Sequence, residues 1–231
     1  MLPIRDDQPR FSTPLVNSFL IGLNLLIFFF EATLSRRDFN GLVNQFGVVP
    51  AHLAALLAGS PRYSLLEVVL PLFTSMFLHG SWLHVIGNMW FLYIFGDNVE
   101  DYLGHFKYLV FYLLTGLIAM STQIAVNLHS SVPTLGASGA IAGVLGAYFV
   151  LYPRARVLTW FFVFVLWVPA WVILGYWFVL NFLSGTATSL AVQGQNMGGV
   201  AFWAHVGGFV SGALLVKVFG ERRLRYPYAV G

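Results

Sequence analysis

The chain has 231 residues, of which 58% are hydrophobic and 9% are charged, and its mean hydropathy is +0.77. A soluble domain carries about a quarter charged residues, so these values exclude a soluble protein and indicate one whose solvent is lipid. The net charge of +3 arises from basic residues beside apolar stretches, with no basic cluster for nucleic acid, and the absence of cysteine excludes disulfides and thiolate chemistry.

The first 14 residues are polar and mixed in charge. They lack the basic start, short apolar region and small-residue cleavage site of a signal peptide, so we expect the apolar segment that follows to remain as a helix. A membrane-spanning helix needs about 20 residues. The sequence therefore predicts an all-α membrane protein, a single domain over residues 1–231 with a bundle of six transmembrane helices. The expected spans are about 14–34, 82–103, 107–126, 138–153, 157–183 and 200–220.

Two connections between these spans have a distinctive composition. The first, residues 35–78, is long, and its apolar stretches 51–59 and 65–73 are too short to cross a bilayer. We expect them to form interfacial helices at the outer membrane face. The second, residues 184–199, is rich in glycine and small polar residues, which is typical of a mobile cap. This loop and the fifth span are candidates for a lid and a lateral gate.

The basic residues predict the orientation of the bundle. In a six-span arrangement nine of them lie on or near the side of both termini, and three lie in the first connection. The positive-inside rule then predicts that both termini are cytoplasmic. The absence of cysteine and the compact form favour a prokaryotic plasma membrane. The nine are Arg5, Arg10, Lys107, Arg154, Arg156, Lys217, Arg222, Arg223 and Arg225, against Arg36, Arg37 and Arg62.

Polar side chains inside the predicted spans are costly in hydrocarbon and therefore suggest function. They are His84 and Asn88 in the second span, Ser138 at the start of the fourth, and His205 in the sixth. Ser138 and His205 each lie 16 residues, or about 24 Å of helix, from the charged residue beyond the inner end of their span. His84 and Asn88 share one helical face at a similar depth. Three helices thus deliver a serine, two histidines and an asparagine to one layer of the membrane.

Glycines surround the serine and continue along two of these helices. Ser138 opens a helix between Gly136 and Gly139, at an N-terminus whose free N–H groups favour an oxyanion. Gly139 begins a GxxxG pattern in the fourth span, and Gly208 begins another in the sixth, one turn after His205. Such patterns let two helices approach closely. We expect this packing to bring the His205 imidazole to the Ser138 hydroxyl, as a general base to a nucleophile.

Each residue alone has a simpler interpretation. A serine that opens a helix is usually a cap, a membrane histidine usually bonds a carbonyl, and His84 and Asn88 could simply join helices. A transporter would use the polar layer as its substrate site, but it predicts a broken helix or inverted repeats, which the sequence does not display. A metal site would need three ligands, and the only candidate pair, His79 and His84, is poorly spaced. The combination of depth, order and spacing favours catalysis.

Three motifs resemble the rhomboid family of intramembrane proteases. They are His79-x4-His84-x3-Asn88 with the following GNMWFLYIFGDNVED, GASGA around Ser138, and AHVGGFVSG around His205. The resemblance runs from Phe46 to the end of the sixth span. It implies an intramembrane serine endopeptidase that cleaves transmembrane protein substrates among membrane lipids, without cofactor or metal.

The resemblance also implies a role for each matching residue. Ser138 would be the nucleophile and His205 its base, with His84, Asn88 and the Ser138 N–H as the oxyanion hole. His79 would steady the loop before the second helix, and Gly208 would pack helices. No acid is placed to orient His205, so the sequence predicts a dyad.

The sequence departs from the family pattern in two places. Ala142 stands where some relatives carry a tyrosine that stacks on the catalytic histidine, so we expect helix packing or another ring, such as Trp203 or Phe202, to orient His205. The first loop also lacks the Trp-Arg pair of some bacterial members. Gln123, Ser121 and Thr122 are candidates to hold the hydrolytic water. A non-catalytic rhomboid-like protein is the competing interpretation, and it would be expected to lack the serine or the histidine.

Overall fold

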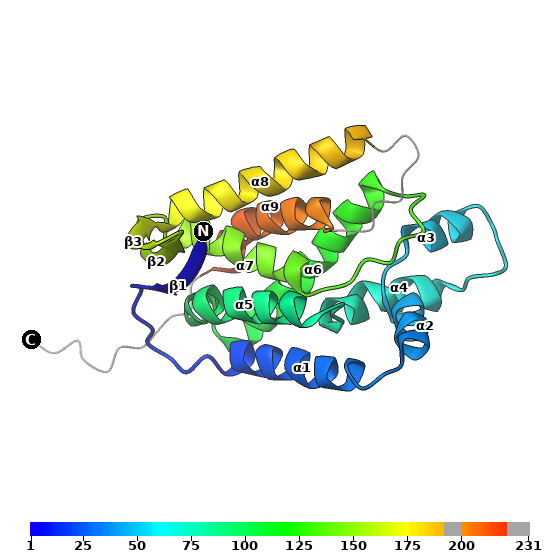
Figure 1. Ribbon diagram of the computed structural model, residues 1–231, viewed down its shortest axis with the longest axis horizontal. Helices are drawn as coiled ribbons and strands as arrows, with labels where there is room; N and C mark the ends of the chain where they lie inside the picture. Colours follow the sequence, from blue (N-terminus) through cyan, green and yellow to red (C-terminus); the bar gives the residue numbers. More distant parts are fainter. Residues whose placement is uncertain (192–199, 221–231) are drawn as a thin grey trace, which may run out of the picture.

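A computed structural model describes residues 1–191 and 200–220 as a helical bundle with a small sheet at one end (Figure 1). Each apolar segment of the sequence contains one helix of the bundle. These are α1 (Leu15–Glu31), α5 (Trp82–Leu103), α6 (His105–Val126), α7 (Ser138–Leu151), α8 (Ala170–Ala191) and α9 (Phe202–Phe219).

Three of these helices, α6, α8 and α9, are long and apolar enough to cross a membrane by themselves. A fourth crossing is formed if α5 is taken together with the helical segment before it, and α1 and α7 are apolar but shorter. The protein is therefore a mostly helical, multi-pass membrane protein, and six full crossings stay a prediction. At 14 residues, or about 21 Å, α7 is shorter than the hydrocarbon core is thick.

The connection between α1 and α5 is helical over most of its length. It contains α2 (Arg36–Phe46), α3 (Pro50–Leu57), α4 (Leu65–Thr74) and the short 3₁₀ helix η1 (Ser75–Phe77). Ser35 caps α2, and Ser64 with Glu67 forms a capping box on α4, so both helices begin where their side chains satisfy free backbone N–H groups. The helices predicted at 51–59 and 65–73 are thus present. The segment through α4 and η1 meets α5 at a bend of 77°.

The prediction of an all-α fold is wrong at the other end of the bundle. There β1 (Leu2–Asp6), β2 (Arg156–Phe161) and β3 (Phe164–Pro169) form an antiparallel sheet in the order β1-β2-β3. The predicted fifth span 157–183 therefore begins with a hairpin, and α8 starts only at Ala170. Aromatic and β-branched residues fill this hairpin, a composition that suits strands once β1 supplies a partner.

Helix α8 also extends past the predicted span. It takes up residues 184–191, which the sequence assigns to a loop, and the remaining loop residues 192–199 lie outside the described residues. The predicted cap is thus helical in its first half.

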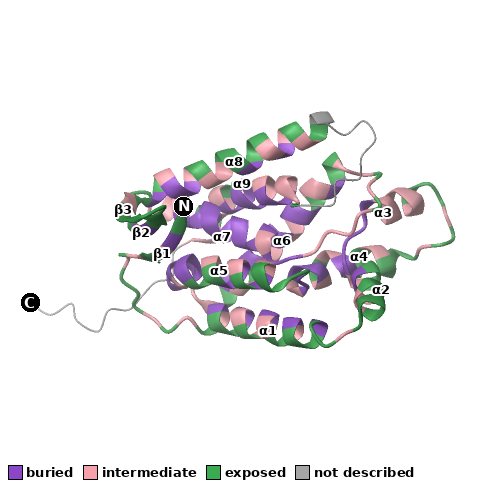
Figure 2. Ribbon diagram, in the orientation of Figure 1, coloured by how far each residue is buried: buried purple, intermediate pink, exposed green. Residues whose placement is uncertain are grey.

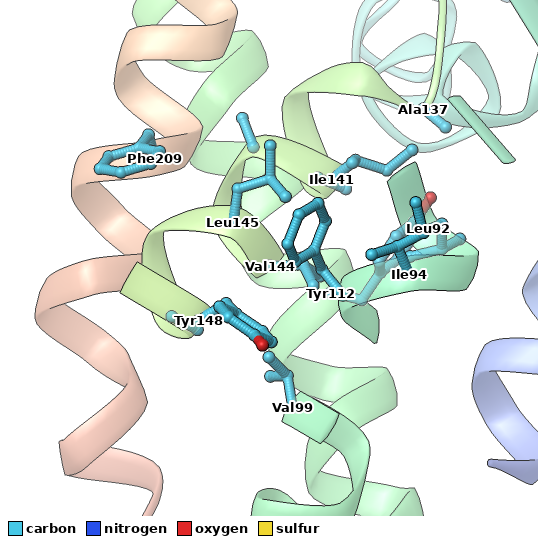
Figure 3. Packing of buried hydrophobic residues seen from close by; sticks show 14 of the residues in the cluster. Leu92, Ile94, Val99, Tyr112, Ala137, Ile141, Val144, Leu145, Tyr148 and Phe209 are labelled. Carbon is cyan, nitrogen blue, oxygen red and sulfur yellow. The ribbon is translucent and has the colours of Figure 1, made fainter. Parts of the chain in front are cut away.

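Helix α7 lies at the centre of the bundle. Every residue from Gly139 to Tyr148 is buried, whereas α1 and α8 expose one side to the surroundings (Figure 2). Ile141, Leu145 and Tyr148 pack against side chains from α5, α6 and α9 (Figure 3). A short helix enclosed by longer ones begins inside the molecule, so its first residue, Ser138, is held away from both ends of the bundle.

Glycines allow α7 and α9 to touch along their backbones. A Cβ atom on Gly208 would lie 2.1 Å from the carbonyl oxygen of Gly139, and one on Gly212 would lie 1.9 Å from that of Gly143. No side chain fits at these distances, so any larger residue would separate the helices. The two GxxxG patterns therefore form the predicted close contact.

Candidate active site

A cavity of about 630 Å³ lies where the first turns of α5, α7 and α9 converge. His84, Asn88, Ser138 and His205 all line it, together with Trp177 of α8. The structure therefore brings the four polar residues predicted from depth and spacing into one space. Most of the remaining wall is apolar, which suits the side chains of a membrane-embedded peptide.

Ser138 and His205 are in direct contact across the α7–α9 interface. The His205 Nε2 atom lies 2.7 Å from the Ser138 Oγ atom, within hydrogen-bond distance. The glycine contacts one turn further along set this separation, because they fix how close the two helices lie. A hydroxyl and a ring nitrogen are thus at the distance that a nucleophile and its general base would need.

The second ring nitrogen of His205 contacts Asn181 of α8. His205 Nδ1 lies 2.6 Å from Asn181 Oδ1, and the Asn181 Nδ2 group donates to the Trp177 carbonyl at 2.8 Å. Because a carbonyl only accepts, the second bond fixes which end of the amide faces the histidine. Asn181 Oδ1 can only accept, so Nδ1 carries the proton of the neutral ring. Nε2 is then the acceptor for the Ser138 hydroxyl.

Sequence reasoning missed Asn181. The predicted span 157–183 places Asn181 two residues from its end, where an amide is unremarkable, whereas the observed α8 places it near the middle of the helix. The sequence suggests for this span only the role of a candidate lateral gate. Among the described residues, the two ring nitrogens of His205 contact Asn181 and Ser138, and that the histidine works without an acid stays a prediction.

The aromatic ring that lies beside His205 is also not one of those expected from the sequence. Trp177 lies 5.5 Å from the imidazole, measured between ring centroids, with the planes tilted by 36°. Trp203, which the sequence suggested for this position, instead donates its indole N–H to Ser189 and contacts Phe182. Trp203 precedes His205 by two residues and therefore points to another side of α9. Both contacts on the far side of the imidazole thus come from α8.

The loop before α7 is held in place by backbone pairing. Thr134 exchanges two backbone hydrogen bonds with Val48, and the Gly136 N–H donates to the Ser75 carbonyl at 2.8 Å. Gly136 has a φ of +123°, and a Cβ atom there would lie 2.7 Å from His84 Nε2. A glycine is required on both counts. The His84 ring therefore lies directly beside the backbone that leads into Ser138.

Asn88 is oriented by a residue outside its own helix. Its Nδ2 group lies 3.0 Å from His79 Nε2, and the His79 backbone N–H donates to the Glu31 carboxylate, 3.1 Å away. Since Asn88 Nδ2 only donates, it uses one N–H on His79 and keeps the other for a ligand. His79 thus does more than steady its loop. Glu31, at the end of α1, was not singled out by the sequence.

The three residues suggested for water binding separate in the structure. Gln123 lines a second cavity of about 370 Å³ that adjoins the first at Pro133, Thr134 and Ala201. The Ser121 and Thr122 hydroxyls donate to carbonyls of their own helix. Gln123 is therefore the one of the three that faces a cavity beside the site. In the described part of the chain, no three histidine, aspartate or glutamate side chains gather as metal ligands.

Comparisons with known proteins agree with the motifs. The family model described as "Rhomboid domain" matches residues 67–222, more than half of the chain. Rhomboid protein 1, mitochondrial, from Saccharomyces cerevisiae is 30% identical over 68% of this chain and 45% of its own length. Rhomboid-like protein 11, chloroplastic, from Arabidopsis thaliana is 32% identical over 64% and 51%. Presenilin-associated rhomboid-like protein, mitochondrial, from Bos taurus is 27% identical over 68% and 44%.

This chain spans about half the length of these curated relatives. The relatives also correct the predicted location, because they are mitochondrial or chloroplastic proteins of eukaryotes. The assignment to a prokaryotic plasma membrane, with cytoplasmic termini, is therefore wrong. The choice of membrane depended on the absence of cysteine and on compactness, and neither property distinguishes a bacterial membrane from an organellar one, whereas the side of the termini came from the basic residues.

Proposed function

Because the chain belongs to the rhomboid family, we propose that it is an intramembrane serine endopeptidase that cleaves peptide bonds in or near transmembrane segments of other proteins. The observation that carries this proposal is the contact of 2.7 Å between Ser138 Oγ and His205 Nε2. Members of the family are generally intramembrane serine proteases, and some are inactive. A member with both residues in hydrogen-bond contact has the groups that the chemistry requires.

The reaction begins with proton transfer from the serine. His205 Nε2 takes the Ser138 proton as Oγ attacks the scissile carbonyl carbon, and a tetrahedral oxyanion forms. The developing charge is stabilised by the free N–H of Asn88, by His84 and by the Ser138 backbone N–H in the first turn of α7. These donors lie around one cavity before substrate binds.

The second half of the reaction returns the enzyme to its starting state. His205 donates its proton to the leaving amine nitrogen, the peptide bond breaks, and Ser138 remains as an ester. A water molecule then attacks the ester carbonyl and gives a proton to His205, which returns it to Ser138 Oγ. The cavity beside Gln123 is a reservoir from which this water can be supplied. No cofactor takes part.

Asn181 completes this machinery as a positioning residue. Its oxygen accepts the Nδ1 proton, so it holds the imidazole in the tautomer that can act as a base at Nε2. Unlike an aspartate, a neutral amide stabilises the imidazolium only weakly. The dyad predicted from sequence therefore becomes a serine–histidine pair with an amide partner.

This contact changes the proposal for a gate. The fifth span was the candidate gate, yet α8 carries Trp177 and Asn181 against His205. A movement of α8 large enough to admit a helix would remove the partner of the base. We therefore propose that α8 holds His205 in position. Substrate must then enter by a route that leaves the contact between α8 and His205 intact.

The transporter interpretation gains one feature from the structure, the 77° bend before α5. A transporter, however, has no need of a serine hydroxyl in contact with a histidine whose tautomer is fixed, so that interpretation leaves the contact unexplained. The non-catalytic interpretation is disfavoured by the presence of both residues.

Cleavage of a single-span reporter in detergent tests the proposal. The unmodified protein should cut the reporter, and Ser138→Ala and His205→Ala should each reduce the rate by at least about a thousandfold. A fluorophosphonate should label the unmodified protein and leave Ser138→Ala unlabelled. Equal cleavage by all three proteins would rule out this site.

A further inference from the structure

The β2–β3 hairpin exposes apolar side chains on both of its faces. The eight residues Trp160 to Trp167 are all exposed, and Phe162 and Val163 at the tip are 79% and 83% exposed. Successive residues of a strand point to opposite faces. Neither face of the outer hairpin is therefore covered by the protein. An apolar patch of this kind marks an interaction site.

The turn of the hairpin contains a bulky residue in a backbone conformation that such residues rarely adopt. Phe162 has a φ of +53°, the one positive value at a non-glycine residue in the described part of the chain. A two-residue hairpin turn with positive φ at its first central residue alone favours glycine at that position, because glycine adopts positive φ without strain. An aromatic residue there carries a local cost. Contact of the tip with an apolar environment would offset this cost.

The position of the hairpin indicates which environment that is. β3 ends at Pro169 and α8 begins at the next residue, and 22 helical residues extend about 33 Å, enough to cross the hydrocarbon core. The hairpin therefore lies beyond the end of this span, at the sheet end of the bundle (Figure 1). β3 is an edge strand with unpaired backbone groups on its outer side, which hydrocarbon cannot satisfy. The headgroup layer offers both water and apolar surface.

Charged residues at the base of the hairpin agree with this placement. Arg154 and Arg156 are exposed there, and the Arg5 guanidinium lies 5.7 Å from the centroid of the Trp167 ring. Asp7 faces the same region, where it accepts the Arg156 backbone N–H. Arginines beside an aromatic surface match lipid phosphates above the acyl chains.

We propose that the β2–β3 hairpin binds the lipid headgroup layer and serves as an interfacial anchor at the start of α8. Its aromatic tip lies at the boundary with the acyl chains, and its arginines lie at the phosphates. The anchor fixes the depth of α8, the helix that carries Asn181. This inference is independent of the proposed catalytic activity.

The absence of cysteine from the sequence makes a site-specific depth measurement direct. Single-cysteine variants Val165→Cys, Leu214→Cys and Arg62→Cys are spin-labelled and reconstituted into phosphatidylcholine vesicles. Collision rates with oxygen and with a water-soluble nickel chelate then report the depth of each label. Leu214 is an exposed residue of α9 and serves as the lipid reference, and Arg62, in the loop between α3 and α4, is the aqueous reference.

The Val165 label should give a depth between the two references. A value equal to that of Arg62 would place the hairpin in water, and one equal to that of Leu214 would place it in the hydrocarbon core. Either result overturns the proposal, as does spin–spin coupling between labelled copies, which would show that a second copy covers the hairpin.

A second variant separates anchoring from folding. Because only the first central residue has a positive φ, Phe162→Gly combined with Val163→Ser gives the turn its preferred residues while removing the apolar tip. In detergent this variant should unfold at the same temperature as the unmodified protein or higher. In vesicles its Val165 label should move toward the aqueous reference. An unchanged label depth would show that the tip does not hold the hairpin in the membrane.

Discussion

The two ends of the bundle both bury polar side chains, but they use them differently. At the sheet end, Glu100 accepts the Val16 and Asn17 backbone N–H groups, and Asp101 accepts the Phe11 N–H and the Ser12 hydroxyl. At the other end, His84, Asn88, Ser138 and His205 come from three helices and line one cavity of about 630 Å³.

This difference separates structural polarity from functional polarity. Glu100 and Asp101 use their oxygens on the N-terminus of α1, where a negative charge is favourable, on the segment that leads into it, and on His105. Asn88 and Ser138 keep hydrogen-bonding capacity that faces open space. Burial of a polar residue in a membrane protein is therefore a weaker sign of function than a hydrogen-bonding group that faces a cavity without a partner in the protein.

The largest expected effect that tests this comparison is that of Asn88→Ala. Loss of one oxyanion donor should lower kcat by about 10²- to 10³-fold with little change in folding. Reporter cleavage measures the rate, and thermal unfolding in detergent checks the fold. Asn24→Ala is a matched control, because this buried asparagine donates only to a carbonyl of its own helix. Equal kcat values for the two variants would remove Asn88 from the site.

A smaller effect is expected from Asn181→Leu. The Ser138–His205 contact survives, but the tautomer is no longer fixed, so kcat should fall about ten- to a hundredfold with KM nearly unchanged. Asn181→Asp should restore much of the rate and move the pH–activity profile to higher pH, because a carboxylate stabilises the protonated ring. Tyr176→Phe, on the same helix, should change neither quantity. If Asn181→Asp leaves the profile where it was, the residue has only a packing role.

At the sheet end, Glu100→Gln should affect stability and leave catalysis unchanged. The amide keeps the size of the side chain but loses the charge-assisted bonds to α1 and to His105. Unfolding should become easier by about 1–3 kcal/mol, while kcat per folded molecule stays constant. Thermal unfolding and reporter cleavage on the same sample measure the two quantities. A loss of kcat without a loss of stability would contradict the separation of the two ends.

Much of the site end followed from the sequence, because the relevant rules are local. Helical rise gave the depth of Ser138 and His205, and the glycine pattern gave the face on which their helices meet. Neither rule could reveal Asn181, since the rotation of α8 that turns this side chain toward His205 is set by packing. Orientation of a ring depends on such contacts, which explains why Trp203 was chosen in place of Trp177.

The sheet end was predicted poorly for a different reason. The segment from Val157 onward is apolar enough for a helix, and hydropathy alone does not distinguish a strand from a helix. Only the pairing of β1 with β2, across some 150 residues, decides the matter. A three-stranded sheet is a non-local structure, whereas each helix of the bundle is specified by its own residues.

The smallest effect concerns Asp6, at the sheet end. Burial raises the pKa of this carboxyl from 3.8 to about 6, although the Tyr148 hydroxyl, which donates to it, acts to lower the pKa. The folded protein therefore holds this proton more tightly than the unfolded chain does. The stabilising contribution is complete below about pH 3.8 and is lost as the pH rises to about 6.

The melting temperature in detergent should accordingly fall between pH 4 and pH 7, and Asp6→Asn should remove part of this fall. Tyr148→Phe should instead steepen it, because the ionised carboxylate loses a hydrogen bond that favours it. Other acids titrate over the same range, so the difference between each variant and the unmodified protein is the quantity to measure. Parallel curves for all three proteins would show that the Asp6 proton is not linked to folding.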